Sequence, residues 1–221
     1  MATPSSPAAT MKLVGGDACL DFVNTVGGRI AGLGRVPARV QADKLADYPD
    51  LVAWSIHAGL VGESTGRRLV RLAHARPEPA RAALRRALEF REALYRTLRA
   101  LMLERTPAPA DLSGLNAEIA ACRSRELLAV RPEGLSFEWG DAARRLESPL
   151  WPVARAAAAL LTSPKLEQLR LCGGDDCGWL FLDASRNRSR QWCTMQDCGN
   201  LSKVRRFRER QASRSNRLTR R

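Results

Sequence analysis

The sequence lacks any long run of apolar residues. Runs such as Ala156 to Leu161 are far shorter than the roughly 20 residues that cross a bilayer, so we expect no transmembrane helix. The opening MATPSSPAAT has neither the basic stretch nor the apolar stretch of a signal peptide. We therefore expect a cytoplasmic protein, whose thiols stay reduced and do not form disulfides.

Histidines and catalytic motifs are also scarce. The chain has two histidines, His57 and His74, far apart and without metal-ligand spacing. The phosphate-binding patterns G-x-G-x-x-G and G-x-x-x-x-G-K-[ST] are absent from the sequence. Because no set of nucleophile, base and orienting group is visible either, we expect no catalytic residues and no enzyme.

Lysine is rare, and acidic residues are fewer than basic residues. Only four of the 36 basic residues are Lys, and such an Arg bias can reflect genome composition, so scattered Arg residues carry no weight. The net charge is +13. Residues 165–221 hold 14 basic and 6 acidic side chains, a net charge of +8. This concentration of positive charge predicts a polyanionic partner, most often a nucleic acid.

Four of the six cysteines form two pairs with the same C-x4-C spacing, fifteen residues apart. This pattern is typical of a structural zinc site, in which four thiolates form a tetrahedron. Disulfides, free buried thiols and an iron–sulfur cluster are the alternatives. We expect one structural Zn²⁺, without a catalytic role because no coordination position is open, bound by Cys172, Cys177, Cys193 and Cys198.

The segment around these cysteines resembles the CGNR zinc finger. The resemblance rests on both Cys pairs and on the runs WLFLD (179–183), SRNRSRQWC (185–193), CGN (198–200) and KVRRFRER (203–210). Leu201 stands where the motif has its Arg. Upstream, GGDACLDFVNT (15–25) resembles the start of the ABATE domain. The resemblance implies a bacterial, stress-related transcription regulator whose N-terminal domain senses a signal or mediates protein contacts.

The hydrophobic periodicity predicts an α+β fold. Helices are expected over 47–58 and 80–105, with others beginning near Ser64, Leu112 and Ser148. Alternation over 126–141 predicts a β-hairpin that turns at 131–134. Together with the resemblance, these features predict a mainly helical ABATE-like domain with a small antiparallel sheet, followed by a treble-clef-like ββα zinc finger with four cysteines.

We divide the chain into four parts: a disordered N-terminus (1–11), the ABATE-like domain (12–164), the zinc finger (165–211) and a basic disordered tail (212–221). The apolar segment Leu20 to Val26 is expected to be a strand or a short buried segment. Within it, Asp21 and Asn24 could line a pocket, but we favour hydrogen bonds to local backbone groups. The arginines of helix 80–105, including Arg91, are expected on a solvated face.

A basic helix is expected after the last cysteine, over about 202–211, with Val204 and Phe207 packing it against the zinc site. The predicted nucleic-acid contacts are Arg186, Arg188, Arg190, Lys203, Arg205, Arg206, Arg208 and Arg210. They indicate a DNA-binding transcription regulator that contacts duplex DNA. An RNA-binding accessory protein is the alternative. The sequence leaves open whether the N-terminal domain binds a small-molecule or protein signal. It also leaves open whether the protein forms a homodimer.

Overall fold

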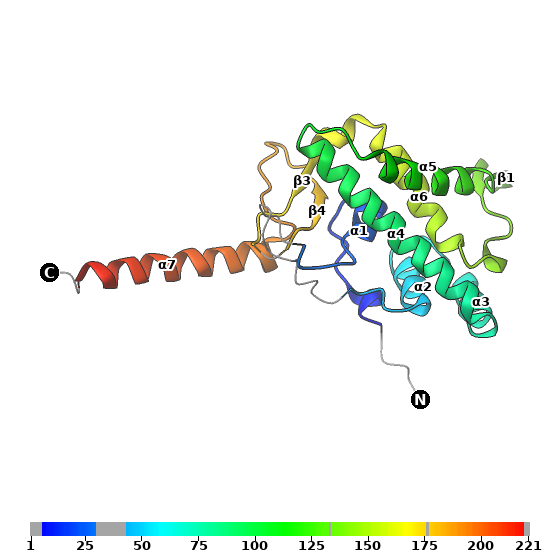
Figure 1. The fold of residues 1–221 in the computed structure, drawn as a ribbon, viewed down its shortest axis with the longest axis horizontal. Coiled ribbons are helices and arrows are strands. Elements are labelled where there is room, and N and C mark those ends of the chain that lie inside the picture. Colours follow the sequence, from blue (N-terminus) through cyan, green and yellow to red (C-terminus); the bar gives the residue numbers. More distant parts are fainter. Residues whose placement is uncertain (1–5, 30–42, 133, 176, 219–221) are drawn as a thin grey trace.

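A computed structural model describes residues 6–29, 43–132, 134–175 and 177–218. It confirms the α+β class, with helices and two small antiparallel hairpins (Figure 1). The first elements are η1 (Pro7–Thr10), α1 (Ala18–Val23), α2 (Tyr48–His57), α3 (Glu63–Ala75), α4 (Pro77–Met102), α5 (Pro109–Arg123), β1 (Leu127–Arg131) and β2 (Gly134–Glu138). The chain continues through η2 (Ala142–Arg144), η3 (Ser148–Leu150), α6 (Trp151–Leu161), η4 (Pro164–Gln168), β3 (Leu169–Leu171), β4 (Leu180–Leu182), η5 (Met195–Gly199) and α7 (Asn200–Leu218).

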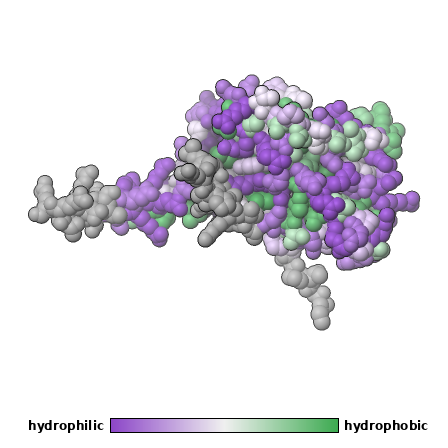
Figure 2. Space-filling view, viewed as in Figure 1, coloured by the Kyte–Doolittle hydropathy of each residue, from purple (hydrophilic) through white to green (hydrophobic). Residues whose placement is uncertain are grey.

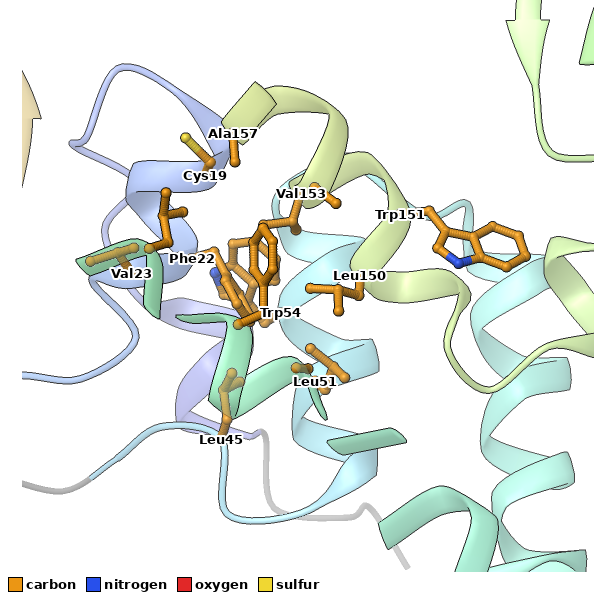
Figure 3. Close-up of a cluster of buried hydrophobic side chains, with 14 of the residues drawn as sticks. Cys19, Phe22, Val23, Leu45, Leu51, Trp54, Leu150, Trp151, Val153 and Ala157 are labelled. Atoms are coloured by element: carbon orange, nitrogen blue, oxygen red, sulfur yellow. The ribbon is translucent and has the colours of Figure 1, made fainter. Parts of the chain in front are cut away.

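Helix α1 lies in the middle of the main core. The Phe22 ring centroid is 5.1 Å from that of Trp54 on α2, and Val153 of α6 packs beside this pair (Figure 3). The predicted burial of this segment is confirmed, but it is a helix and not a strand. The Asp17 side chain accepts a hydrogen bond from the Cys19 N–H (3.0 Å), so it caps the first turn of this short helix.

Helix α2 begins at Tyr48, within the helix expected over 47–58. Asp47 is the N-cap and accepts a hydrogen bond from the Asp50 N–H (2.9 Å), while the Asp50 side chain accepts one from the Asp47 N–H. This reciprocal pair is a capping box. Its carboxylates satisfy two main-chain donors that the helix itself leaves unpaired.

The long helix α4 buries Leu94 and Leu98, as the periodicity predicts, but its basic face is not wholly solvated. Arg91 is only 3% exposed. Its guanidinium donates hydrogen bonds to Asp43 (2.6 and 2.8 Å) and to the Thr25 hydroxyl (2.9 Å). The expectation that Arg91 faces solvent was wrong, because these acceptors from outside the helix stabilise a buried guanidinium.

The predicted hairpin is confirmed as β1 paired antiparallel with β2, with Glu133 of its turn outside the described residues. Trp139, directly after β2, fixes the base of the hairpin. Its indole N–H donates to the Cys122 carbonyl (3.3 Å), and its ring lies 6.2 Å from that of Trp151. The guanidinium of Arg155 lies 4.9 Å from the Trp139 ring centroid.

Both ends of the described chain contain more structure than the sequence predicted. Residues 6–11 were expected to be disordered, yet η1 forms there, and Ala8 and Met11 are buried against the core. At the other end α7 continues to Leu218, past the expected helix end near residue 211. Within the described ranges, every helix is too short or too polar to cross a membrane.

Candidate metal centre and nucleic-acid interface

The four paired cysteines meet at one point. Their sulfur atoms all lie within 4.8 Å of one another, with Sγ–Sγ distances of 3.7 Å for Cys177–Cys193 and 3.5 Å for Cys193–Cys198. A zinc ion at the usual Zn–S distance of about 2.3 Å keeps its four sulfurs roughly 3.8 Å apart. The sulfur positions therefore fit a single structural zinc ion, as the spacing predicts.

The site also favours a thiolate at Cys172. Hydrogen bonds from the thiols of Cys177 and Cys193, and from the Cys193 main-chain N–H (3.2 Å from the Cys172 sulfur), lower the pKa of Cys172 far below its ordinary value. Hydrogen bonds to the charged form favour that form. Zinc binds thiolates and not thiols, so Cys172 is the ligand whose charged form its neighbours favour. The same interactions with Cys172 raise the pKa of Cys177 and Cys193.

Two glycines in the first knuckle are required by close packing. A Cβ at Gly174 would lie 3.1 Å from the Cys198 sulfur, so any other residue would crowd this ligand. Gly178 has a φ of +66°, and a Cβ there would lie 1.7 Å from the Arg29 carbonyl oxygen. The knuckle thus packs directly against the main chain of the N-terminal region.

Residues 12–29 form a seat for the zinc module. Their main-chain carbonyls accept hydrogen bonds from Leu182 N–H (to Gly15, 2.8 Å), from the Trp179 indole (to Val26, 3.0 Å) and from the Arg190 guanidinium (to Val14, 3.2 Å). Lys12 adds an ion pair of 2.6 Å with Asp197 in the second knuckle. We call residues 12–29 the seat below.

The two polar side chains singled out in the seat bind backbone, but not both locally. Asp21 accepts a hydrogen bond from the Gly15 N–H (2.8 Å). Asn24 bonds to Leu180, which lies 156 residues later in the sequence. Its side chain donates to the Leu180 carbonyl (2.8 Å) and accepts from the Leu180 N–H (2.9 Å). The preference for backbone hydrogen bonds over a pocket is thus supported, but for Asn24 the expectation of a local partner was wrong.

The loop between the Cys pairs is shaped by Asp183, which is fully buried. Its carboxylate accepts hydrogen bonds from the N–H groups of Ser185 and Arg190 (both 2.9 Å). The Ser185 side chain first, and then these N–H groups, hold the pKa of Asp183 below its ordinary value. Arg186 and Arg188 are consequently exposed on the loop. Arg190 instead turns inward, where its guanidinium donates to the Trp192 (3.0 Å) and Cys193 carbonyls and lies 4.2 Å from the Phe181 ring centroid.

Helix α7 begins at Asn200, two residues after the last ligand, Cys198, and extends away from the body of the molecule (Figure 1). Its spacing puts Lys203, Arg206 and Arg210 on one face, and all three are exposed. The predicted packing of Val204 and Phe207 against the knuckle was wrong, since these side chains are 48% and 55% exposed. The helix leaves the knuckle within its first turns, so little of its length can pack there.

Comparison with protein-family models agrees with this geometry. Residues 16–164 match the ABATE family, described as "Putative stress-induced transcription regulator". The chain belongs to the ABATE family. Residues 168–211 match the CGNR zinc finger, which confirms the second resemblance. Among curated proteins, none matches the chain. These matches support a regulatory role for this ABATE protein.

Two residues that join the zinc finger to the ABATE region, Lys12 and Asn24, were not among the predicted metal ligands or nucleic-acid contacts. Asp183, which shapes the loop inside the module, was also not predicted. A polar residue inside an apolar run, as Asn24 is, was the available signal. Its partner could not be identified, because nothing in the sequence marks one backbone group among the many in a distant strand.

Proposed function

We propose that this protein is a cytoplasmic DNA-binding transcription regulator in which a zinc ion orders a basic helix for contact with duplex DNA. The observation that carries the proposal is the projection of α7 from the metal centre, with its cations exposed and the helix clear of the ABATE body (Figure 1). Cations at this density form hydrogen bonds and ion pairs with DNA phosphates and release condensed counterions.

The proposed interface contains fewer residues than were predicted from the sequence. It comprises Arg186, Arg188, Lys203, Arg206, Arg208 and Arg210. Arg190 is left out because its guanidinium is bonded within the module and to the Val14 carbonyl of the seat. Arg205 is given a minor role because it forms an ion pair with Asp175 of the first knuckle. The exposed Val204 and Phe207, next to the cationic face, are suited to apolar contact with thymine methyl groups.

Catalysis is not part of the proposal. Four thiolates leave a zinc ion no open position for water, which supports a structural role for the metal. The ABATE domain is proposed to receive a signal or to make protein contacts. Its family description supports such a role.

The test is fluorescence anisotropy of a labelled duplex at several salt concentrations. Replacing Arg206 and Arg210 by Gln should weaken binding and reduce the slope of log K against log [salt] by about 2. The matched control, Arg68→Gln with Arg71→Gln, removes the same charge from exposed positions on α3 and should leave that slope nearly unchanged. An Arg205→Gln variant should lose less affinity than Arg206→Gln.

Two outcomes would contradict the proposal. Absence of affinity for any duplex at low salt would exclude it outright. Displacement of the duplex by structured RNA at much lower concentrations than by unlabelled DNA would instead identify an RNA-binding protein.

A further inference from the structure

The hairpin β1–β2 presents an uncovered apolar face. Opposed residues of an antiparallel pair lie on the same side of the sheet, and the pairs Leu128–Phe137 and Val130–Leu135 are neighbours on one side. These four side chains are 59%, 61%, 83% and 68% exposed, in the order just given. Figure 2 shows apolar surface at the end of the molecule where Figure 1 labels β1.

The hairpin that carries this face is anchored at its base. Trp139 anchors the base of the hairpin to α5 and α6 through the contacts described above, so the strands keep a fixed position. A two-stranded sheet is only marginally stable until something packs on its apolar side. The largest contiguous apolar patch on a typical protein monomer covers about 300–600 Å² and is often functional.

The charges around the face argue against a strongly charged partner. None of the four side chains that form it is ionisable. Nearby charges are matched within the chain: Arg131 pairs with Glu138 on the opposite side of the hairpin, and Arg125 pairs with Asp141 (3.5 Å) at its base. A basic or acidic partner would therefore find no unmatched charge in these pairs.

We propose that this face is the interface between two copies of the chain. Four such side chains amount to an apolar surface on the order of 500 Å², so two copies packed face to face would bury roughly 1,000 Å², the lower limit for a specific interface. Two-fold packing of identical faces suits a self-complementary apolar patch. The apolar residues of α7 are a weaker candidate, because pairing two α7 helices there would bring their arginines together.

The inference is independent of the proposed function, since the interface lies on the hairpin and involves no nucleic acid. It also predicts a distinct salt response. With a net charge of +13 on each chain, added salt screens repulsion between copies and should strengthen the dimer. Salt should weaken nucleic-acid binding. The two associations can therefore be separated in one set of measurements.

The experiment is sedimentation velocity of the full-length, zinc-loaded protein without nucleic acid, over a range of protein and salt concentrations. We expect a mass of twice 24.3 kDa for the wild type. Val130→Lys with Phe137→Lys should weaken dimerisation by at least about 100-fold, since each lysine faces like charge in the interface. The matched control adds two lysines at other exposed apolar positions, Leu103→Lys with Leu112→Lys, and should remain dimeric.

Zinc content and the midpoint of thermal unfolding are measured for both variants, to show that each is folded. A wild type that stays monomeric at every concentration and salt would overturn the inference. So would a dimer that survives the hairpin substitutions, or one that the control variant disrupts equally.

Discussion

The carboxamide of Asn24 hydrogen-bonds both polar main-chain groups of Leu180. Its Nδ2 donates to the carbonyl oxygen (2.8 Å), and its Oδ1 accepts from the N–H (2.9 Å). Asn24 thereby takes the place of a neighbouring strand on the free side of β4. Both residues are buried, so these bonds have no competition from water.

Replacing Asn24 by Ala should destabilise the protein by roughly 2–4 kcal/mol, because two buried main-chain groups lose their partners. Denaturant unfolding of the zinc-loaded protein measures the change. Asn200→Ala is the matched control, since that amide is exposed and donates to the Gln196 carbonyl one turn earlier (3.1 Å). The control should cost less than about 0.5 kcal/mol. Equal losses in the two variants would show that the Leu180 bonds contribute little.

Adding one methyl group at Gly178 should lower the stability of the folded protein by far more than the small size of that group suggests. A Cβ there meets the Arg29 carbonyl, and the φ of +66° disfavours any L side chain. We expect Gly178→Ala to lose more than about 3 kcal/mol in unfolding experiments. Gly114→Ala, in α5 with open space around its Cβ position, should instead stabilise by about 0.5–1 kcal/mol.

Asp21 should give stability an unusual pH dependence. Burial raises the pKa of Asp21 to about 6, above the value of about 3.9 in an unfolded chain. The folded state thus binds the proton more tightly, so this carboxyl favours folding at low pH, and its contribution is lost as pH rises through 6.

Asp21→Asn keeps an acceptor for the Gly15 N–H and removes the charge. Relative to the wild type, the variant should gain roughly 1 kcal/mol between about pH 5 and pH 7.5. Denaturant unfolding at each pH, with zinc present, tests this. If the two stability curves run parallel over that range, Asp21 does not titrate as its burial implies.

Removal of zinc should unfold the module and spare most of the helices. Trp179 and Trp192 pack against the cysteine cluster, so a chelator should shift the tryptophan emission to the red while most of the helical circular dichroism signal remains. Cys193→Ser should bind no zinc at neutral pH. Cys122→Ser, at a buried thiol outside the site, should retain one zinc per chain by mass spectrometry. A full zinc complement in Cys193→Ser would contradict the four-thiolate site.

The parts that could be predicted from the sequence are those whose signal is local and repeated. The C-x4-C spacing occurs twice, and the four sulfurs do converge. The alternation over 126–141 covers several residue pairs, and the helical period over 80–105 covers several turns. A single residue that departs from either pattern therefore does not change the predicted element. Alternation, however, does not say whether the apolar face of the hairpin is covered.

The parts that could not be predicted depend on contacts between distant segments. Helix α1 has six residues, too few for its period to separate a helix from a buried strand. Arg91 has the pattern of a surface residue and is buried only because Asp43 and Thr25 approach it. Val204 and Phe207 have core-like spacing, yet α7 leaves the knuckle before they can pack on it.

The bond between Asn24 and Leu180 also bears on how the protein is made. At about 5–20 residues per second, the ribosome releases Leu180 roughly ten seconds or more after Asn24. Until then the side chain of Asn24 has no partner in β4. This contact between the two parts of the protein can therefore form only after residue 180 has been made, and we expect zinc binding by the module to stabilise the ABATE region through it.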